Sequence, residues 1–417
     1  MQLEVLPDHR SRQIIVGTSV RKPLVILKAY LDSLASQELP VRTHLRFVFV
    51  ADFTPEQKDA EDYLRAWVKE RDGEVLRGQP SPIGDFREGP MTHEWTLSSM
   101  QRVGQNKNKI LKRTLDLKAD AVWFVDADLI LDRTTLSSLM ACEKPMVTAV
   151  YWTVWSKAVN ETQPPHAGPQ VWLRHPYQLD GRGMDEAEFR QHLINRELTR
   201  VWGFGACTLI QRFILEAGVD FSPAPDVPQV GLMAGEDRQF CITAERKHLD
   251  AWADPWPDAF HIYHASDDVP QIPGFVERLG MAHPDRAVLG DLVSLRLLAM
   301  EPVPQGPNWA HQPPQYVRGR LGSLPLMPEL EEAIYGLHRG EKAVVRIHCP
   351  IHHPMPYLRG RSRLIEVTLI DCKPFQASPV IERELYISPQ SKRVTDGLAL
   401  TVEQQHLTEE RTLELVR

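Results

Sequence analysis

The chain has 417 residues, of which 42% are hydrophobic and 25% charged, with a formal net charge of -7. This composition excludes a disordered or collagen-like chain, and the length is comfortable for two domains that each bury a core. The mild excess of acidic residues argues against a general nucleic-acid binder or membrane-surface binder.

Strands and helices alternate over the first 125 residues. The predicted strands are Arg12–Thr18, Leu45–Ala51, Glu74–Arg77 and Ala121–Val125. The spacing of apolar residues predicts helices over Pro23–Ser36, from Thr54 to about Arg71, and over Leu97–Leu117. This alternation indicates an α/β fold with a parallel sheet that has helices on its faces.

The pattern is more mixed between residues 145 and 264. The predicted elements are a strand over Pro145–Trp155, a polar loop over Asn160–Gln170, an apolar segment over Val201–Ile210, a helix over Gln211–Ala217, a loop over Pro223–Gly231, a helix over Gly235–His248, and strands over Ala251–Asp254 and Ala259–His264. We find no internal repeat.

Asp126 and Asp128 follow directly after the apolar strand that ends at Val125. Ligands of open parallel sheets bind beyond the carboxyl ends of the strands. Mg²⁺ and Mn²⁺ are typically bound by one or two carboxylates together with phosphate oxygens of a substrate. The alternative is a solvated junction between strand and loop. A third acid at Asp132 and the buried strand before the pair leave both interpretations open.

Four segments together resemble the nucleotide-sugar domain of GT-A glycosyltransferases, most nearly those of glycosyltransferase family 2. They are IIVGTS, LRFVFVAD, GQNKNKILKRTLDLKAD and WFVDADLIL. The resemblance implies a GT-A (Rossmann-like) mixed sheet flanked by helices over residues 1–290, with a nucleoside-diphosphate sugar as the donor and Mn²⁺ or Mg²⁺ as the metal.

The resemblance also assigns residues to the donor and the metal. The donor residues are Thr18, Ser19 and Arg21 in the loop after the first strand, Asp52 at the base, and Asn106 and Lys107 on the helix before the acid pair. Asp128 is implied to coordinate the metal, and Asp126 to contact the ribose or a metal-bound water, which makes Asp126 a second candidate ligand.

The downstream segments WGFGACTLIQRFILEAGVDF and AGEDRQFCITAERKHLDAWADP resemble the acceptor half of the same family. They imply an inverting enzyme with Asp237 as general base and Glu236 as second candidate. Both residues could equally be ordinary acids at a helix N-terminus. In FHIYH, a spacing of three along a strand does not put both imidazoles on one face, so at most one is a metal ligand; we favour His264 over His261. A surface or core imidazole is the alternative for each.

Aromatic residues gather in the middle of the chain at Tyr151, Trp152, Trp155, Trp172, Trp202 and Phe204. Aromatic faces pack against the C–H surfaces of sugars, and Trp152 and Trp202 flank the proposed chemistry in sequence. For most of the six, ordinary core packing is the simpler interpretation. The chain departs from the family at Val50-Ala51-Asp52-Phe53. It also lacks a Gln-x-x-Arg-Trp motif, so we expect no processive polysaccharide synthase.

Residues 291–375 have a different character. A strand over Leu292–Glu301, a helix over Glu329–Leu337, and strands over Lys342–Ile347 and Ser362–Cys372 are predicted. The order resembles the FKBP-type prolyl isomerase fold, most closely its trigger-factor variant, which implies a small α+β domain. The aromatic residues available for the cleft of such a domain are few, namely Trp309, Tyr316, Tyr335 and Tyr357, so a binding module is favoured over an active isomerase. Residues 376–417 form a polar extension with a strand at Glu384–Ile387 and a helix at Glu403–Leu415.

The sequence therefore predicts a metal-dependent, hexosyltransferase-like enzyme with an unknown acceptor, a protein or glycan docked by the C-terminal domain. The alternatives are a non-catalytic chaperone-like or structural assembly protein with a degenerate GT-A domain, and a nucleotidyltransferase. The chain shows five cysteines without a CxxC pair, no signal pattern, and no apolar run of about 18 residues. We accordingly expect a cytoplasmic protein without a membrane span and without a nucleic-acid partner.

Overall fold

The computed structural model describes residues 11–40, 42–79, 96–156, 166–173, 186–194, 196–205, 207–228, 235–281, 287, 291–300, 303–305, 308–310, 314–321, 324, 326, 328–349 and 359–373. The chain divides into two compact units. One consists of Met1–Tyr151 with Val171–Phe375, and the other of Trp152–Gln170 with Gln376–Arg417.

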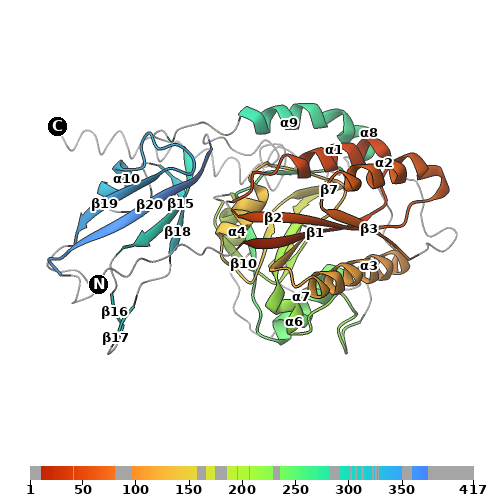
Figure 1. Cartoon of the computed structure of the whole chain (residues 1–417), viewed down its shortest axis with the longest axis horizontal. Coiled ribbons are helices and arrows are strands. Elements are labelled where there is room, and N and C mark those ends of the chain that lie inside the picture. The colour runs from red at the N-terminus through yellow and green to blue at the C-terminus, as the bar shows by residue number, and fades with distance from the viewer. Residues whose placement is uncertain are drawn as a thin grey trace. The chain divides into compact units, whose positions relative to one another are not determined.

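An eight-stranded mixed sheet forms the centre of the first unit (Figure 1), in the order β10-β13-β6-β12-β4-β1-β2-β3. Its strands are β1 (Arg12–Val20), β2 (Thr43–Ala51), β3 (Gly73–Arg77), β4 (Ala121–Val125), β6 (Met146–Ala149), β10 (Thr199–Val201), β12 (Cys207–Gln211) and β13 (Ala251–Asp254). The first four are parallel, as predicted, whereas β12 runs antiparallel to both its neighbours. The expectation of a mixed α/β fold with a large sheet is confirmed.

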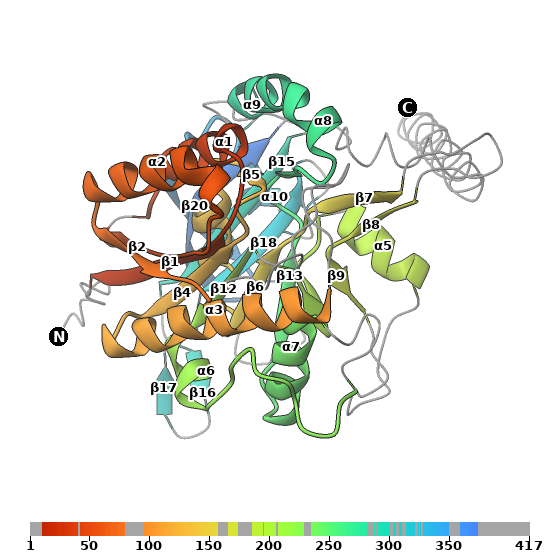
Figure 2. The same cartoon turned by 90° about the vertical axis from the view of Figure 1, so that its right-hand side faces the viewer.

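Helices cover both faces of this sheet (Figure 2), with α1 and α2 on one face and α3, α6 and α7 on the other. The helices are α1 (Leu24–Ala35), α2 (Lys58–Lys69) with the short 3-10 turn η1 (Pro55–Gln57), α3 (Leu97–Asp116), α4 (Thr135–Ala141), α6 (Arg212–Glu216) and α7 (Glu236–Arg246). Because both faces are covered, the central strand β4 is apolar throughout, and every one of its residues is buried.

Alternate residues of β1 point to opposite faces of the sheet. Ile14, Val16 and Val20 belong to the core under α1 and α2. Gly17 faces α3, where a Cβ atom would lie only 2.5 Å from the side chain of Ile110. The glycine therefore lets α3 pack directly on the central strand.

The carboxyl ends of β1, β2, β3 and β4 lie at one edge of the sheet because these strands are parallel. The loop after β1, Asp52 after β2 and the acid pair after β4 consequently meet at that edge. A short pair of strands, β5 (Leu129–Leu131) and β14 (Ala259–His261), extends from the acid pair. The sequence did not predict β5, and the strand expected over Ala259–His264 ends three residues early.

Helical segments follow β14, namely α8 (Ala265–Asp268), η3 (Val269–Gln271) and α9 (Ile272–Met281). Helix α5 (Glu186–Ile194) and the strand pair β9 (Val171–Trp172) with β11 (Gly203–Phe204) were not predicted either. These elements are too short or too weakly patterned for periodicity to single them out. The predicted loop over Gly78–Thr92 lies largely outside the described residues.

The single strand predicted over Pro145–Trp155 is wrong, because the apolar run contains two strands. Strand β6 ends at Ala149, and β7 (Trp152–Ser156) pairs with β8 (His166–Pro169) as a hairpin in the second compact unit. Strand β8 also lies within the segment predicted to be a loop. Nothing in the apolar pattern marks the break, since both strands are apolar.

A four-stranded antiparallel sheet follows, in the order β18-β15-β20-β19. Its strands are β15 (Leu292–Ala299), β18 (Gln315–Arg320), β19 (Lys342–His348) and β20 (Ser362–Lys373), and β16 (Val303–Gln305) pairs with β17 (Asn308–Ala310). Helix α10 (Pro328–Glu332) is shorter than predicted and continues as turns to Gly336, whose φ is 79°. The likeness to FKBP-type domains stays a prediction. The elements predicted after Phe375 lie outside the described residues.

Buried charges join this second sheet to the eight-stranded sheet. Arg318 of β18 forms an ion pair with Asp254, the last residue of β13. Lys373 of β20 places its Nζ atom 2.7 Å from Oδ2 of Asp132. Both sheets accordingly belong to one compact unit. In the part of the chain that is described, no helix is both long and apolar enough to cross a membrane.

Candidate active site

Asp126 and Asp128 lie where the chain turns after the central strand β4. The turn is closed by the amide of Leu129, which donates to the carbonyl of Asp126 at 3.1 Å. Asp128 is buried and Asp126 is half-buried. The turn thus holds two carboxylates at the carboxyl end of the sheet, as the sequence predicted.

The carboxylate of Asp128 contacts a lysine and a histidine. The Nζ atom of Lys22, just after β1, lies 2.6 Å from Asp128 Oδ2. The Nε2 atom of His261 lies 3.7 Å from the same oxygen. The second contact follows from the pairing of β5 with β14, which sets His261 opposite Leu129.

His264, the histidine favoured from the sequence, directly precedes α8. Its amide donates to Asp268 Oδ2 at 2.7 Å, and its ring packs edge-on against Tyr263 with centroids 5.1 Å apart. His261 is therefore the imidazole seen beside Asp128. The role of His264 as a metal ligand stays a prediction.

Lys107 joins α3 to the first turn of α7. Its Nζ atom lies 2.8 Å from Glu236 Oε1 and 2.6 Å from Asp237 Oδ1, and the lysine is only 2% exposed. The helices approach closely because residue 104 is glycine: a Cβ atom there would lie 3.2 Å from Cβ of Glu236 in α7. Glu236 and Asp237 are accordingly more than helix-terminal acids in water.

The carboxylates of this region influence one another. Burial raises the pKa of Asp126 to about 8; Lys107 opposes the rise, whereas Asp128, Asp237 and Glu236 add to it. Burial likewise raises the pKa of Asp237 to about 6, against the attraction of Lys107. The residues at the ends of β4 and α7 thus form one electrostatic cluster.

Lys107 itself stays charged within this cluster. Burial lowers its pKa, but the carboxylates of Asp237, Glu236 and Asp126 outweigh that effect and raise the pKa above its ordinary value. The cluster holds the acids Asp126, Asp128, Glu236 and Asp237 against the ammonium groups of Lys22 and Lys107. Carboxylate oxygens are ligands that hard divalent cations prefer.

Within the described ranges, no group of three or more His, Cys, Asp or Glu side chains is arranged so that it could hold a metal ion. A metal at this site would thus be bound by Asp128, with Asp126 or His261, and would depend on phosphate oxygens of a donor for the remaining ligands. That division between protein and substrate is usual for Mg²⁺.

The residues predicted to bind the nucleotide lie at the ends of the neighbouring strands. Asp52 after β2 is buried, with its Oδ2 atom 3.0 Å from Nε of Arg102 and 3.8 Å from Arg21. Burial raises the pKa of Asp52, and Arg102 and Arg21 counteract the rise. Asp52 and Arg21, predicted separately, are thus brought together.

Asn106 and Ser19 also meet, since the Nδ2 atom of Asn106 donates to Ser19 Oγ at 3.0 Å. Thr18 points the other way. Its hydroxyl lies 2.5 Å from the hydroxyl of Tyr30 in α1, within the core, because successive residues of a strand face opposite sides. A donor contact through the Thr18 side chain stays a prediction without geometric support.

The two tryptophans chosen from the sequence belong to different compact units. Trp202 donates from Nε1 to Glu245 Oε1 at 2.9 Å, and the guanidinium of Arg200 lies 4.8 Å from its ring centre. Trp152 begins β7 and therefore belongs to the other compact unit. Their roles in sugar binding stay predictions.

Sequence reasoning missed Lys22 and Arg102. Arg102 precedes Asn106 by four residues on α3, a spacing that puts both on one helix face and could have identified it. Lys22 follows a strand end next to Pro23, but only the pairing of β1 with β4 brings it to Asp128.

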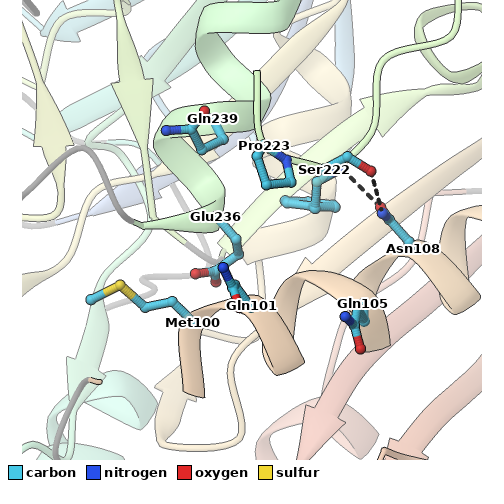
Figure 3. Close-up of a pocket in the computed structure, with 9 residues that line it drawn as sticks. Met100, Gln101, Gln105, Asn108, Ser222, Pro223, Glu236 and Gln239 are labelled. Atoms are coloured by element: carbon cyan, nitrogen blue, oxygen red, sulfur yellow. Dashed lines mark hydrogen bonds between the residues drawn. The ribbon is translucent and has the colours of Figure 1, made fainter. Parts of the chain in front are cut away.

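A cavity of about 340 Å³ opens beside Glu236 (Figure 3). It is lined by Met100, Gln101, Gln105 and Asn108 of α3, by Phe221, Ser222 and Pro223, and by Glu236 and Gln239 of α7. Asn108 fixes the loop, accepting from the amide of Phe221 at 2.8 Å and donating to Ser222 Oγ at 3.2 Å. Four of the nine lining residues have neutral amide side chains, and one, Glu236, is a carboxylate that belongs to the acid cluster.

No family model matches this chain. Over 171 residues, 38% of the chain, it is 26% identical to a glycosyltransferase 25 family member of Drosophila pseudoobscura pseudoobscura. The match spans 26% of that protein's length. The chain is thus similar, over part of its length, to part of a glycosyltransferase.

Solved structures give distant similarities. GalNAc-T7 with UDP, GalNAc and Mn²⁺ has a TM-score of 0.41 and 14% identity, covering 62% of this chain and 45% of that one. The Pyrobaculum calidifontis mannosyltransferase PcManGT with GDP-Man and Mn²⁺ has a TM-score of 0.35 and 15% identity, covering 65% of each chain. S. aureus TarS 1-349 with UDP has a TM-score of 0.33 and 13% identity, covering 60% of this chain and 59% of that one. Since these similarities are weak, the proposals below depend on the residues of the chain itself.

Proposed function

We propose that this protein is a metal-dependent, inverting glycosyltransferase that moves a hexose-like sugar from a nucleoside-diphosphate donor to an acceptor hydroxyl. The observation that carries the proposal is the acid cluster. Lys107 lies 2.6 Å from Asp237 at the start of α7 and lowers the pKa of Asp126 after β4, whereas Asp128 and Asp237 raise it.

The donor end of the site consists of residues at the carboxyl ends of β1, β2 and β4. We assign the base to Asp52 and Arg102, and the ribose to Asp126 with Ser19 and Asn106. Asp128, with Asp126 or His261, would bind a divalent cation. When bound, such an ion neutralises charge that develops on the leaving diphosphate. The role of the chain's own residues is to orient the donor so that its anomeric carbon faces α7.

The acceptor end consists of the first turn of α7. We assign the general base to Asp237, with Glu236 as second candidate. As the acceptor oxygen bonds to the anomeric carbon, the carbon–oxygen bond to the diphosphate breaks and the hydroxyl proton moves to the carboxylate. A pKa of about 6 makes Asp237 a better base than an ordinary aspartate. Lys107 keeps it ionised and in place.

The cavity beside Glu236 is our candidate for part of the acceptor site. Its volume of about 340 Å³ is near the lower limit of small-ligand pockets. Neutral amides from Gln101 and Gln105 can donate to and accept from hydroxyl groups, as a polyhydroxylated acceptor requires. Docking of a protein or glycan acceptor by residues 291–375 is a separate proposal, since none of these residues lines the cavity.

One contact favours an alternative. Lys22 already supplies a positive charge to Asp128, at 2.6 Å. The alternative is a degenerate GT-A domain that has no metal chemistry and has an assembly or chaperone-like role. In such a domain, Lys22 would take the place of a metal ion beside Asp128. The two functions differ in their response to Mn²⁺.

Binding measurements test the proposal. We expect UDP-, GDP- or dTDP-sugars to raise the melting temperature of the full chain, and one of them to do so much more in the presence of Mn²⁺ than in EDTA. Hydrolysis of that donor, with water as the acceptor, should also need the metal. No stabilisation by any donor under either condition would overturn the assignment.

A further inference from the structure

The strand pair β5–β14 links two distant groups of charges. Asp128 and Asp132 stand immediately before and after β5. The ladder extends to both, because the amide of Ile262 donates to the carbonyl of Asp128 and the amide of Asp132 donates to that of Asp258, each at 2.9 Å. A shift at one end of so short a ladder is therefore transmitted to the other end.

The ammonium group of Lys373 holds the Asp132 end. Its Nζ atom lies 2.7 Å from Asp132 Oδ2, 3.0 Å from the carbonyl oxygen of Trp256, and 3.6 Å from Asp258 Oδ2. These oxygens come from the end of β5 and from the segment that leads into β14. One side chain thus binds both strands at the same end of the ladder.

This contact is fully enclosed. Lys373 is 2% exposed and Asp132 is 0% exposed. The Asp132 carboxylate is oriented further by Thr134, whose amide donates to Oδ1 at 2.9 Å. Arg196, at 3.0 Å, supplies a second cation to Asp258. Without Lys373, the carboxylates of Asp132 and Asp258 would lose the ammonium group that lies near both of them.

We propose that Lys373 is a positioning residue for Asp128: it fixes the far end of the β5–β14 pair so that the Asp128 carboxylate keeps its place beside Lys22 and His261. The inference rests on the proposed function, since it concerns the residue assigned to the metal. Metal–oxygen distances for Mg²⁺ are set to a few tenths of an ångström, so a small displacement of Asp128 weakens binding. Lys373 thus acts from the second sheet, 241 residues from Asp132.

Two measurements on the full chain test the proposal with Lys373→Met, which keeps the apolar stem and removes the charge. The first is hydrogen exchange of residues 128–132 and 258–262. We expect faster exchange along the whole ladder, including the amide of Ile262 at the Asp128 end. The second is binding of Mn²⁺ with UDP or GDP, which we expect to weaken at least tenfold, while nucleotide binding in EDTA is unchanged.

Arg318→Met is the matched control. It removes the other buried ion pair between the two sheets, to Asp254, without a direct bond to β5 or β14. We expect it to lower the melting temperature but to leave both measurements at their wild-type values. Asp132→Asn is a milder second variant, should Lys373→Met fold poorly, and should shift both measurements in the same direction by a smaller factor.

The outcomes separate the two proposals. Faster exchange confined to the Asp132 end, or a wild-type Mn²⁺ affinity in Lys373→Met, overturns the positioning role. An equal effect of Arg318→Met on both measurements overturns it too, because Lys373 would then only stabilise the fold in general. If the wild-type chain binds no nucleotide with Mn²⁺, the proposed function fails. The exchange pattern then still decides whether Lys373 orders the ladder up to Asp128.

Discussion

Lys22 places its ammonium group 2.6 Å from the carboxylate of Asp128, where a bound divalent ion would also seek that oxygen. The two cations compete, so we expect Lys22→Met to bind Mn²⁺ about tenfold more tightly, a difference of about 1.4 kcal/mol. Titration calorimetry without nucleotide would measure it. Lys112→Met, which removes an exposed pair with Asp116 at 2.8 Å, is the control. Unchanged Mn²⁺ affinity together with lost nucleotide binding would favour the metal-independent alternative.

Asp128→Asn should remove metal-dependent donor binding without unfolding the protein. The amide keeps the shape of the side chain but loses the charge that a hard cation needs, so we expect the Mn²⁺-dependent part of donor binding to fall on the order of 100-fold. The measurement is donor affinity with and without Mn²⁺, alongside circular dichroism. Asp116→Asn on the surface of α3 serves as the control. Global unfolding of Asp128→Asn would show that the residue is structural.

Asp237→Asn should impair chemistry more than donor binding. If Asp237 takes the proton of the attacking hydroxyl, its loss should lower the rate of donor hydrolysis on the order of 100-fold or more, with donor affinity near the wild-type value. Single-turnover hydrolysis and calorimetry separate the two quantities. The matched variant is Glu236→Gln, which should have the smaller effect. The reverse order would transfer the role of base to Glu236.

Lys107→Met should destabilise the fold strongly. The substitution leaves Glu236 and Asp237 buried beside each other without their cation, and removal of one partner of a buried pair costs roughly 3–5 kcal/mol. Urea denaturation followed by fluorescence gives the free energy of unfolding. Lys112→Met on the same helix should cost less than about 1 kcal/mol. Comparable losses in the two variants would argue that the buried contact is weak.

Gly104→Ala should lower the stability of the protein, although a change from glycine to alanine usually stabilises a helix. In an exposed helix interior, alanine is favoured over glycine by about 1 kcal/mol. At residue 104, however, the added methyl would lie 2.9 Å from the carbonyl oxygen of Phe221 and 3.2 Å from Cβ of Glu236. We expect the free energy of unfolding to fall by about 1–3 kcal/mol and donor hydrolysis to become slower. Lys112→Ala, at an exposed position of the same helix, is the control, and a stabilised Gly104→Ala would contradict the close packing of α3 on α7.

The sequence predicted those parts of the fold in which local pattern and burial agree. Strand β4 is an apolar run enclosed on both faces, and α3 and α7 have clear beginnings. Asp126, Asp128 and Asp237 could therefore be proposed as site residues from the sequence. The break between β6 and β7 could not, since both strands are apolar and only tertiary packing separates them. The assignment of His264 over His261 could not be settled by spacing either, because the end of β14 depends on its pairing with β5.

The partners of the acid residues were the least predictable part of the site. Lys107 precedes Glu236 by 129 residues, and nothing in either local sequence indicates the other. Lys373 lies one residue beyond the strand predicted over Ser362–Cys372, and the sequence indicated no role for it. Long-range ion pairs of this kind are fixed by the packing of whole elements, and a single sequence contains no signal for them.

The buried links between the two sheets also determine how the chain can be divided in the laboratory. A fragment that ends near residue 290 would retain all the residues that we assign to donor, metal and base. It would nevertheless expose Asp132, Asp254 and Trp256, which are buried in the full chain. Asp132 would also lose its contact with Lys373, and Asp254 its contact with Arg318. The smallest piece expected to fold around the acid cluster therefore extends through Lys373, and expression trials of shorter fragments should return insoluble protein.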